Sequence, residues 1–381
     1  MKTAIVTLPL HTNYGGLLQA YALKSLVEQL GHEATVLDIS RKISLPKAGK
    51  APFIYLKRLL QGREVFRERR LLREYPVISS KINKFTDKYI SPCLISSYSD
   101  LKKSDYQAYI VGSDQVWRPE YFGTVQDAFL RFAKGWDVKR IAYAASFGTD
   151  QLEYDYTLLE ECAELLSKFD AVSVREASAV NMCDEWLDYE GAVHVPDPVM
   201  MLSAEHYSLL AGENLNGTGS VVTYILDRSS AKSRVVDFVA GVTGKPVCDI
   251  SVYPKEKSIP LEERVVPEME SWISAFRNAE FVVTDSFHGC VMSIIFHKPF
   301  LVVGNKARGM ARIDSLIGMF ELENRLVDGI DPDDDGEGWL LEFDWEKVDS
   351  VLQEFRQTGL DFLKSALNMD GTPDSGKEEV Q

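Results

Sequence analysis

The segment 284–289, Thr-Asp-Ser-Phe-His-Gly, brings a carboxylate, a hydroxyl and an imidazole together where a predicted strand meets an apolar helix. Asp285, Ser286 and His288 are the residue types of a Ser-His-Asp relay. A turn from strand to helix does not align them as one, and the G-x-S-x-G elbow is not there. His288 opens the helix and is better placed to contact an anion or to act as an acid or base. The alternative is a buried histidine that is hydrogen-bonded in the core.

A second candidate is the loop Asn13-Tyr14-Gly15-Gly16, which joins a β-branched run to a helical pattern at 17–30. Two glycines let backbone N–H groups approach an anion at the N-terminus of that helix. The loop has neither the G-x-G-x-x-G spacing nor a carboxylate placed for a ribose, so it is a weak nucleotide signature. The alternative is a tight turn that requires positive φ.

Four cations follow predicted strands and are candidates for binding carboxylate or phosphate. Arg175 ends the strand at 171–174, and three more follow the strand at 300–303: Lys306, Arg308 and Arg312. Arginine holds such anions through a fork of two parallel hydrogen bonds. For any one of these cations the alternative is a solvated surface charge.

Small and polar side chains follow two other buried strands. Ser113, Asp114 and Gln115 come after the strand at 108–111, and Ser146 follows the strand at 141–145. Such groups can hydrogen-bond a polar ligand at the carboxyl edge of a sheet. The alternative for the first group is a helix start capped by Ser113 or Asp114.

An acidic stretch fits the spelling of a calcium-binding EF-hand loop, with these residues at ligand positions: Asp331, Asp333, Asp335 and Glu342. Gly338 takes the place of the usual apolar residue, and no helix is predicted before the loop. An acidic surface loop is the favoured interpretation, and no metal is expected.

The order of predicted elements places these candidates on two α/β units. In the first, a strand at 2–8, a helix at 17–30 and a strand at 33–39 form a βαβ unit, which indicates a parallel sheet. The second begins near the turn-forming segment 214–219, has strands at 221–226, 245–250, 281–284 and 300–303, and is followed by a late helix at 345–367. The carboxyl ends of parallel strands form the ligand crevice in such sheets.

The composition bounds the class of protein. The chain of 381 residues suits two domains, and 42 Lys+Arg against 57 Asp+Glu give a net charge of −15 at pH 7. That acidity excludes a general nucleic-acid-binding surface, which needs a surplus of Lys and Arg. Five dispersed cysteines without a C-x-x-C pair fit a reducing cytoplasm. No run reaches the apolar length of a membrane span, so we predict a cytoplasmic protein.

Seven segments, in their order and spacing, resemble the polysaccharide pyruvyl transferase family over about residues 1–330. They are TNYGGLLQAYALKSLVEQLGHE (12–33), DYQAYIVGSDQVW (105–117), RIAYAASFG (140–148), AVSVRE (171–176), PDPVMML (196–202), VVTDSFHGCVMSIIFHKPF (282–300) and RIDSLIGMFELENR (312–325).

The resemblance implies two Rossmann-like domains that face each other across a cleft, similar to the GT-B glycosyltransferases. It implies transfer of the enolpyruvyl group of phosphoenolpyruvate onto two hydroxyls of a sugar in a bacterial surface or capsular glycan precursor, often lipid-linked. A cyclic pyruvate ketal forms, phosphate leaves, and no cofactor is required. We place the domains at 1–205, with a basic helical insertion at 41–90, and at 206–345. A helix at 346–369, which we expect to pack on the N-terminal domain, and a disordered tail at 370–381 follow.

Carried onto this sequence, the family motif makes His288 the catalytic residue. It could protonate C3 of the donor, deprotonate a sugar hydroxyl or bind phosphate as an imidazolium. The residues assigned to the donor and its anionic groups are Arg175, Ser286, Lys306, Arg308, Arg312, Asn13, Tyr14 and Gly15. The residues assigned to the acceptor sugar are Ser113, Asp114, Gln115 and Ser146.

One position departs from the family pattern. Other branches read Arg-Leu-His where this chain reads Ser286-Phe287-His288. Either Lys306, Arg308 or Arg312 replaces that arginine, or this branch binds a different donor. Two other functions stay open: a GT-B-like glycosyltransferase that uses a nucleotide-sugar, and a non-catalytic protein that binds glycans or anions.

Residues 41–74 hold 11 basic and 3 acidic residues and predict one helix at 51–74 with apolar side chains along it. We hypothesise that this helix contacts an anionic membrane surface, where each near-surface cation contributes about 1 kcal/mol. The protein would then be peripheral to the membrane. The alternative is a cationic helix that packs on its own domain or joins copies of the chain in a homo-oligomer.

Overall fold

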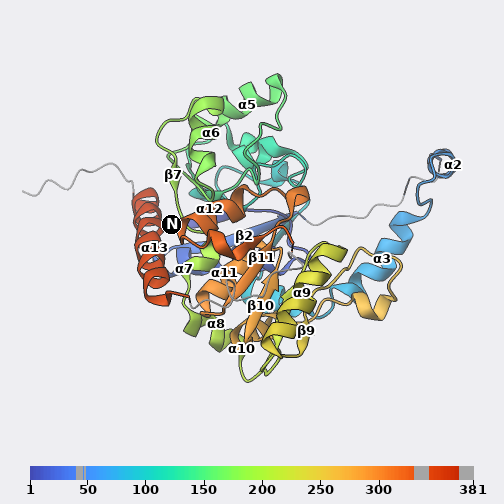
Figure 1. Cartoon of the computed structure of the whole chain (residues 1–381). Helices are drawn as coiled ribbons and strands as arrows, with labels where there is room; N and C mark the ends of the chain where they lie inside the picture. Colours follow the sequence, from blue (N-terminus) through green and yellow to red (C-terminus); the bar gives the residue numbers. More distant parts are fainter. Residues whose placement is uncertain (40–45, 47–48, 330–342, 369–381) are drawn as a thin grey trace, which may run out of the picture.

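The computed structural model describes residues 1–39, 46, 49–329 and 343–368. Two parallel sheets with helices around them form its two halves, and a long C-terminal helix lies beside them (Figure 1). This arrangement confirms the predicted α/β class with two Rossmann-like units and a C-terminal helix.

The N-terminal sheet has seven parallel strands in the order β3-β2-β1-β4-β5-β6-β7. Their bounds are β1 Lys2–Val6, β2 Glu33–Ile39, β3 Cys93–Ile95, β4 Ala108–Asp114, β5 Lys139–Ala145, β6 Ala171–Val174 and β7 Val193–His194. Every residue of the central strand β4 is buried. Parallel sheets are covered by helices on both faces, which is why their central strands tolerate few exposed positions.

The C-terminal sheet has five parallel strands in the order β12-β11-β10-β8-β9. Their bounds are β8 Val221–Tyr224, β9 Val247–Asp249, β10 Phe281–Thr284, β11 Phe300–Val303 and β12 Leu326–Val327. The runs Phe-Val-Val-Thr of β10 and Phe-Leu-Val-Val of β11 are buried throughout. Such short β-branched and aromatic runs form central strands because their side chains pack on both faces of the sheet.

Helices cover both sheets. In the N-terminal half they are α1 Tyr14–Gln29, α2 Ala51–Leu60, α3 Arg67–Ile78, α4 Ile82–Phe85, α5 Tyr156–Leu166, α6 Ser178–Leu187, α7 Pro198–Met201 and α8 Ala204–Ala211. Later in the chain they are α9 Ser230–Thr243, α10 Met269–Asn278, α11 Phe287–Ile295, α12 Ala311–Met319 and α13 Trp345–Asn368. Short 3-10 or π turns lie at Thr86–Ile90, Tyr98–Asp100, Val125–Phe129, Arg131–Ala133, Leu261–Arg264, Lys306–Arg308 and Glu323–Arg325.

In each sheet the strand order reverses once, and open α/β sheets bind ligands at this reversal, beyond the carboxyl ends of the strands. In the N-terminal sheet the reversal lies between β1 and β4, and in the C-terminal sheet it lies between β8 and β10. The chain that leaves β1 reaches Asn13, and β4 ends at Asp114. The chain that leaves β10 passes through Ser286 into α11, which carries His288 in its first turn.

The two halves share an apolar core. One cluster of buried side chains includes Ile5 and Leu18 from the N-terminal half and Trp272 and Val291 from the C-terminal half. Tyr14 stacks on Trp272 with ring centroids 5.2 Å apart. Its hydroxyl donates a hydrogen bond of 3.0 Å to the Pro267 carbonyl. The start of α1 is therefore fixed against the C-terminal half, and the two reversal points face each other.

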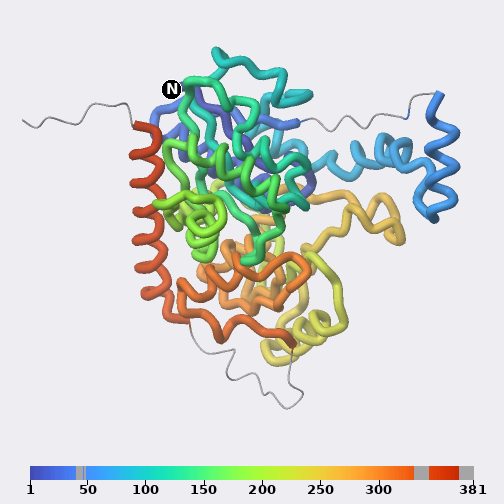
Figure 2. Tube along the Cα trace, turned by 90° about the horizontal axis from the view of Figure 1, so that it is seen from above, coloured from blue at the N-terminus to red at the C-terminus, as the bar shows by residue number. Residues whose placement is uncertain are grey.

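The C-terminal helix α13 runs along one side of both halves, as Figure 2 shows from above. The Lys139 ammonium of β5 donates a hydrogen bond of 2.9 Å to the Leu367 carbonyl near the end of α13. Near its start, Asp349 accepts one of 2.8 Å from His297 of the C-terminal half. The predicted boundary between residues 205 and 206 falls inside α8, and the domain limits stay a prediction.

The single helix predicted at 51–74 is wrong, because α2 and α3 are separate helices. Gly62, with a φ of 62°, lies between them in the left-handed conformation that ends many helices. We call residues 50–78 the arm, because they project from the body of the molecule in Figures 1 and 2.

The alternative interpretation of Ser113 or Asp114 as the cap of a helix is not what the structure shows. β4 continues through both residues, and Asp114 pairs with Ala145 of β5. A short turn follows in place of a helix. Pairing across the sheet has therefore prevailed over the local capping preference of these side chains.

Candidate active site

The start of α1 contacts the start of α11, so the two reversal points meet at Gly15 and His288. A Cβ atom built on Gly15 would lie 2.1 Å from Nδ1 of His288, closer than any side chain can approach. A Cβ on the neighbouring Gly16 would have its nearest neighbour at 3.7 Å, in the Asn13 side chain. Asn13 caps α1 by accepting a hydrogen bond from the Gly16 amide. The predicted loop is thus a capped helix start whose first glycine makes room for the imidazole.

His288 is buried between the two halves. Its Nε2 has no hydrogen-bond partner among the residues that the structure describes and lies 3.8 Å from Oδ2 of Asp197. Burial lowers the pKa of His288 from its ordinary value, and the carboxylates of Asp197 and Asp114 oppose that shift. The imidazole is therefore held mostly neutral near pH 7, with a free nitrogen beside acidic and basic neighbours.

Arg175 lies between two carboxylates. Its Nη1 donates to Oδ2 of Asp197 at 2.7 Å, and its Nη2 donates to Oδ1 of Asp114 at 3.0 Å. The guanidinium also lies 4.8 Å from the ring centroid of Phe287. Burial would raise the pKa of Asp114, but the charges of Arg175, His288 and Arg312 outweigh it and hold that pKa low. Arg175 is thus fixed and already neutralised by the protein.

Asp197 is a site residue that the sequence reasoning did not single out. Its Oδ1 caps α7 by accepting from the Val199 amide at 3.0 Å. Its Oδ2 accepts from Arg175 and also from the Ser113 hydroxyl at 2.9 Å. An aspartate followed by proline is a helix-start signal, and nothing in that signal points to a distant arginine or histidine.

Arg312 of α12 differs from Arg175 and Arg308, because it does not pair with a carboxylate of the described residues. The residue is half-buried, it donates from Nη2 to the Arg308 carbonyl at 3.2 Å, and its Nε atom is buried without a hydrogen-bond partner among the described residues. Burial, followed by the charge of Arg175, lowers the pKa of Arg312 to about 10, while Asp114 and Glu176 oppose the shift. Within the described part of the chain it forms no ion pair. A half-buried arginine whose N–H groups are not all hydrogen-bonded to the protein is suited to bind an anion.

The other two predicted cations differ from Arg312. Arg308 forms a fork with Asp227, with Nη2 3.0 Å from Oδ1. Lys306 is exposed on the turn that precedes α12.

Ser286 and Asp285 have structural hydrogen bonds. The Ser286 hydroxyl caps α11 by accepting from the Gly289 amide at 3.4 Å. Asp285 accepts from the Lys232 ammonium at 2.6 Å and from the Leu226 amide, also at 2.6 Å. Its carboxylate therefore points toward the 226–232 region and not toward His288, which agrees with the absence of a Ser-His-Asp relay.

The predicted acceptor residues lie close to the cluster and bond to the protein. The Ser113 amide donates to Oε1 of Gln19 at 3.0 Å, and the Ser146 hydroxyl donates to Oε1 of Glu176 at 3.0 Å. The Gln115 side chain packs on Gly148, where an added Cβ would lie 1.9 Å from its Oε1. The sequence thus brings all four predicted acceptor residues to one edge of the N-terminal sheet, and their binding roles stay a prediction.

A scan against protein families matches residues 13–307 to the polysaccharide pyruvyl transferases. That range runs from the cap of α1, through the Arg175 and Asp197 contacts, to the turn before α12. The chain belongs to the polysaccharide pyruvyl transferase family. Family membership makes it a transferase that acts on a polysaccharide.

Similar folds occur among glycosyltransferases. The spinosyn rhamnosyltransferase SpnG with thymidine diphosphate is 13% identical, with a TM-score of 0.39 over 96% of both chains. The glycotransferase of kitacinnamycin is 11% identical, with a TM-score of 0.46 over 96% of this chain and 99% of its own. MurG of Acinetobacter baumannii is 10% identical, with a TM-score of 0.40 over 96% and 94%. These similarities do not indicate which ligand this chain binds or which reaction it catalyses. A search of curated proteins gives no match.

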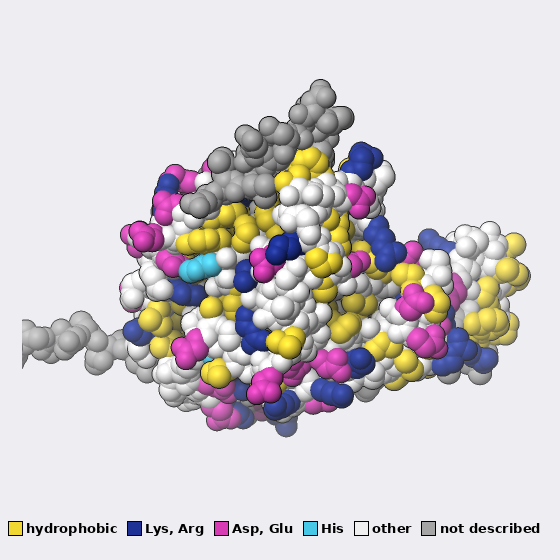
Figure 3. All heavy atoms as spheres, turned by 60° about the horizontal axis from the view of Figure 1, so that its bottom comes forward, with side chains coloured by type: hydrophobic (Ala, Val, Ile, Leu, Met, Phe, Trp, Pro, Cys, Tyr) yellow, Lys and Arg dark blue, Asp and Glu magenta, His cyan; other side chains and the backbone are white. Residues whose placement is uncertain are grey.

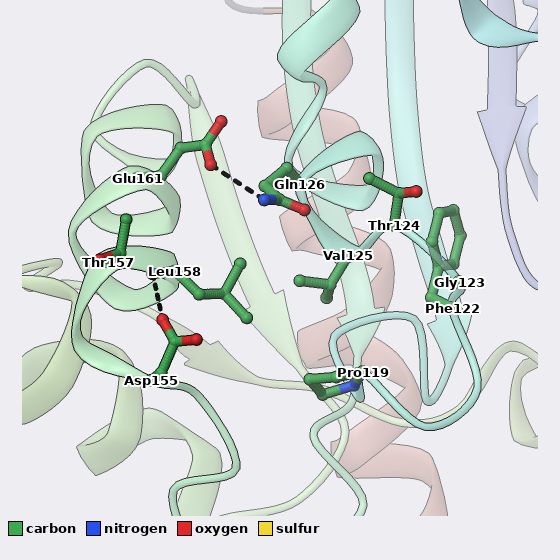
Figure 4. Close-up of a pocket in the computed structure, with 10 residues that line it drawn as sticks. All are labelled: Pro119, Phe122, Gly123, Thr124, Val125, Gln126, Asp155, Thr157, Leu158 and Glu161. Atoms are coloured by element: carbon green, nitrogen blue, oxygen red, sulfur yellow. Dashed lines mark hydrogen bonds between the residues drawn. The ribbon is translucent and has the colours of Figure 1, made fainter.

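In this member of the pyruvyl transferase family, a hollow on the surface lies apart from His288. Figure 4 shows that it lies between the segment 119–126 and helix α5. Its volume is about 340 Å³. Gln126 and Glu161 hydrogen-bond across it at 2.9 Å. It contains none of the predicted site residues, and the contact of the reversal points carries the stronger chemical argument.

The sequence also raises the questions of a calcium-binding loop and of membrane-spanning segments. The acidic loop of Asp331, Asp333, Asp335 and Glu342 lies outside the described residues. Within the described residues, no group of three or more metal-binding side chains is placed to hold an ion. No described helix combines the length and apolar character needed to cross a membrane.

Proposed function

We propose that the protein transfers the enolpyruvyl group of phosphoenolpyruvate onto two hydroxyls of one sugar, forming a pyruvate ketal and releasing phosphate. Family membership supports the transferase class. The observation that carries the finer proposal is the buried His288 with the half-buried Arg312 near it, since each has a buried nitrogen without a hydrogen-bond partner among the described residues. A guanidinium without an ion pair can bind an anionic donor, and a neutral imidazole near it can exchange a proton with that donor.

In the proposed reaction, Arg312 binds the phosphate or the carboxylate of the donor and supplies the cation that other branches of the family place at the position of Ser286. The arriving negative charge raises the pKa of His288, which takes up a proton. His288 then protonates C3 of the donor, and positive charge develops at C2. The first sugar hydroxyl attacks C2 and returns its proton to the imidazole.

The second half of the reaction removes phosphate. The bond between C2 and the phosphate oxygen breaks, and the second hydroxyl of the same sugar attacks C2 to close the ketal. Its proton leaves with phosphate. One proton enters at C3 and two leave the hydroxyls, so the products are one ketal and one hydrogen phosphate.

The test is phosphate release from phosphoenolpyruvate with a panel of oligosaccharide acceptors. Acceptor-dependent release, with a product heavier by the pyruvate ketal, supports the proposal. Thermal stabilisation by nucleotide-sugars alone would instead favour a glycosyltransferase. Glycan binding without phosphate release would favour a non-catalytic protein.

Replacing Arg312 with Met should raise the KM for phosphoenolpyruvate about 10- to 100-fold, because a charged hydrogen bond to the donor contributes about 1.5–3 kcal/mol. Arg312→Lys should recover part of this loss, since it keeps the charge without the fork. Initial rates of phosphate release against donor concentration measure the effect. Lys306→Gln is the control on the adjoining turn, and an equal rise in KM there would argue against a special role for Arg312.

Gly15→Ala should lower kcat/KM for phosphate release about 100-fold, because its Cβ displaces the imidazole of His288. Gly16→Ala is the matched control in the same helical turn, where the added methyl meets ordinary contacts. The control should stay within about twofold of the parent. Equal activity of both variants would show that the position of His288 at this contact does not govern the reaction.

A further inference from the structure

We propose that the arm is a membrane-binding element that docks on an anionic lipid surface. The inference rests on the shape and charge of residues 50–78 and does not depend on the reaction proposed above. The first observation is that α2 has no buried residue. Phe53 is 74% exposed, Leu56 55% and Leu60 79%. They recur at helical spacing, so they form one apolar face that points away from the protein.

The opposite face of α2 holds the arm together. Tyr55 packs against Phe66 with ring centroids 5.1 Å apart. Arg58 forms an ion pair of 2.6 Å with Glu68 at the start of α3. The polar and aromatic contacts are thus made inward, and the aliphatic and phenyl side chains remain on the outer face.

The base of the arm is fixed to the C-terminal half. Glu64 pairs with Lys257 at 2.6 Å, and Glu74 pairs with Arg264 at 3.0 Å. The apolar face therefore sits at the end of a supported projection, and Figure 3 shows hydrophobic side chains gathered there with Lys and Arg beside them. A supported projection can reach a flat surface while the body stays back from it.

The charges on the arm select the kind of surface. Its three glutamates are all paired within the chain: Glu64 with Arg70 and Lys257, Glu68 with Arg58, and Glu74 with Arg70, Arg73 and Arg264. Besides Lys50 at the start of the arm, four exposed cations form no ion pair with any residue the structure describes: Lys57, Arg63, Arg67 and Arg69. Helices that lie in the headgroup region of anionic membranes typically have an apolar face flanked by cations that are not paired within the protein.

The same charges argue against pairing with a second copy through this face. Two arms related by a two-fold axis would bring like cations together around the apolar side chains. A bilayer with anionic lipids meets both requirements, because it offers acyl chains to Phe53, Leu56 and Leu60 and negative headgroups to the cations. The chain has a net charge of −15, so an anionic membrane would repel the body of the protein. The projecting arm would keep the body away from the membrane surface.

The experiment is flotation of the full chain with phosphatidylcholine vesicles that contain or lack phosphatidylglycerol. We expect the parent to float only with the anionic vesicles and to be released by high salt, which screens the cations. Changing Lys57, Arg63, Arg67 and Arg69 together to Gln should weaken the apparent affinity at least about 100-fold. The triple change Phe53→Ser, Leu56→Ser and Leu60→Ser should also abolish flotation.

Matched control variants test whether vesicle binding depends on the arm or on any exposed leucine or lysine. Leu209 and Leu215 on the body are 78% and 75% exposed, and changing both to Ser should leave flotation unchanged. Lys102→Gln with Lys103→Gln is the charge control. Thermal unfolding should be the same for every variant, because none of these side chains is buried.

Three outcomes would overturn the proposal. The first is equal flotation of parent and arm variants. The second is flotation that does not depend on the anionic lipid. The third is a parent that sediments as an oligomer and becomes monomeric in the Ser variant without any vesicle binding, which would assign the apolar face to a second copy.

Discussion

Replacing His288 with Gln is expected to lower phosphate release from phosphoenolpyruvate by about 10²- to 10⁴-fold, the usual loss when a general acid or base is removed. The imidazole lies where the starts of α1 and α11 meet, and its buried Nε2 has no hydrogen-bond partner in the described part of the chain. Glutamine fills similar space and still offers polar atoms, but it cannot exchange a proton. The loss should therefore appear in kcat, measured by continuous phosphate detection, with a smaller change in donor binding.

The matched control is His297→Gln. His297 lies just beyond the other end of α11, where it is partly exposed and bonded to Asp349. The same chemical change at this site should leave the rate within about twofold of the parent. A His288 variant with parental kcat would contradict the proposed proton transfer, and equal losses in both variants would indicate damage to α11.

Stability gives a second readout of His288 that does not need substrate. Burial lowers the pKa of the folded-state imidazole, so below about pH 6.5 the unfolded chain binds a proton that the folded chain resists. The free energy of unfolding should therefore fall as the pH drops through that region. The fall should be smaller in His288→Gln, and urea titrations at several pH values measure the difference.

The sequence predicts the two parallel sheets well because short buried strands and intervening helices leave local signals. β-branched runs such as those of β1 and β10 alternate with helical patterns, and polar turns mark where each strand ends. The same local signals fail where tertiary contacts decide. Ser113 and Asp114 have the side chains of a helix cap, but pairing with β5 keeps them in the sheet. Gly62 divides the predicted helix of the arm.

The site shows a similar division. His288, Arg175 and Asp114 can be proposed from their places after strands, since the carboxyl edges of the sheets gather such residues. Their pairing cannot be proposed in that way. The sequence predicts that Arg175 binds an anionic group of the donor, and it gives no sign that Asp114 and Asp197 pair with this arginine in the structure. Arg308 and Arg312 are both half-buried, but Arg308 pairs with Asp227, whereas Arg312 forms no ion pair with a described residue and its buried Nε has no hydrogen-bond partner among them.

Asp197 contacts both Arg175 and His288 at this site. One oxygen accepts from Arg175 and from Ser113, and the same oxygen lies 3.8 Å from Nε2 of His288. It therefore fixes the arginine and also raises the pKa of the histidine against the effect of burial. We regard Asp197 as a positioning residue, because it acts on the reaction through His288.

Asp197→Asn should reduce stability by about 3 kcal/mol, because a buried guanidinium loses one of its two carboxylates. Asp155→Asn is the matched control: Asp155 caps α5 as Asp197 caps α7, and it should cost at most about 1 kcal/mol. Without the negative charge of Asp197, the pKa of His288 falls further. The limb of the rate profile that reports His288 should therefore move to lower pH, whether the histidine acts first as acid or as base. Chemical denaturation and the pH dependence of kcat/KM measure the two effects. A stability loss with an unshifted pH profile would show that Asp197 supports the fold alone and leaves the proton of His288 to other groups.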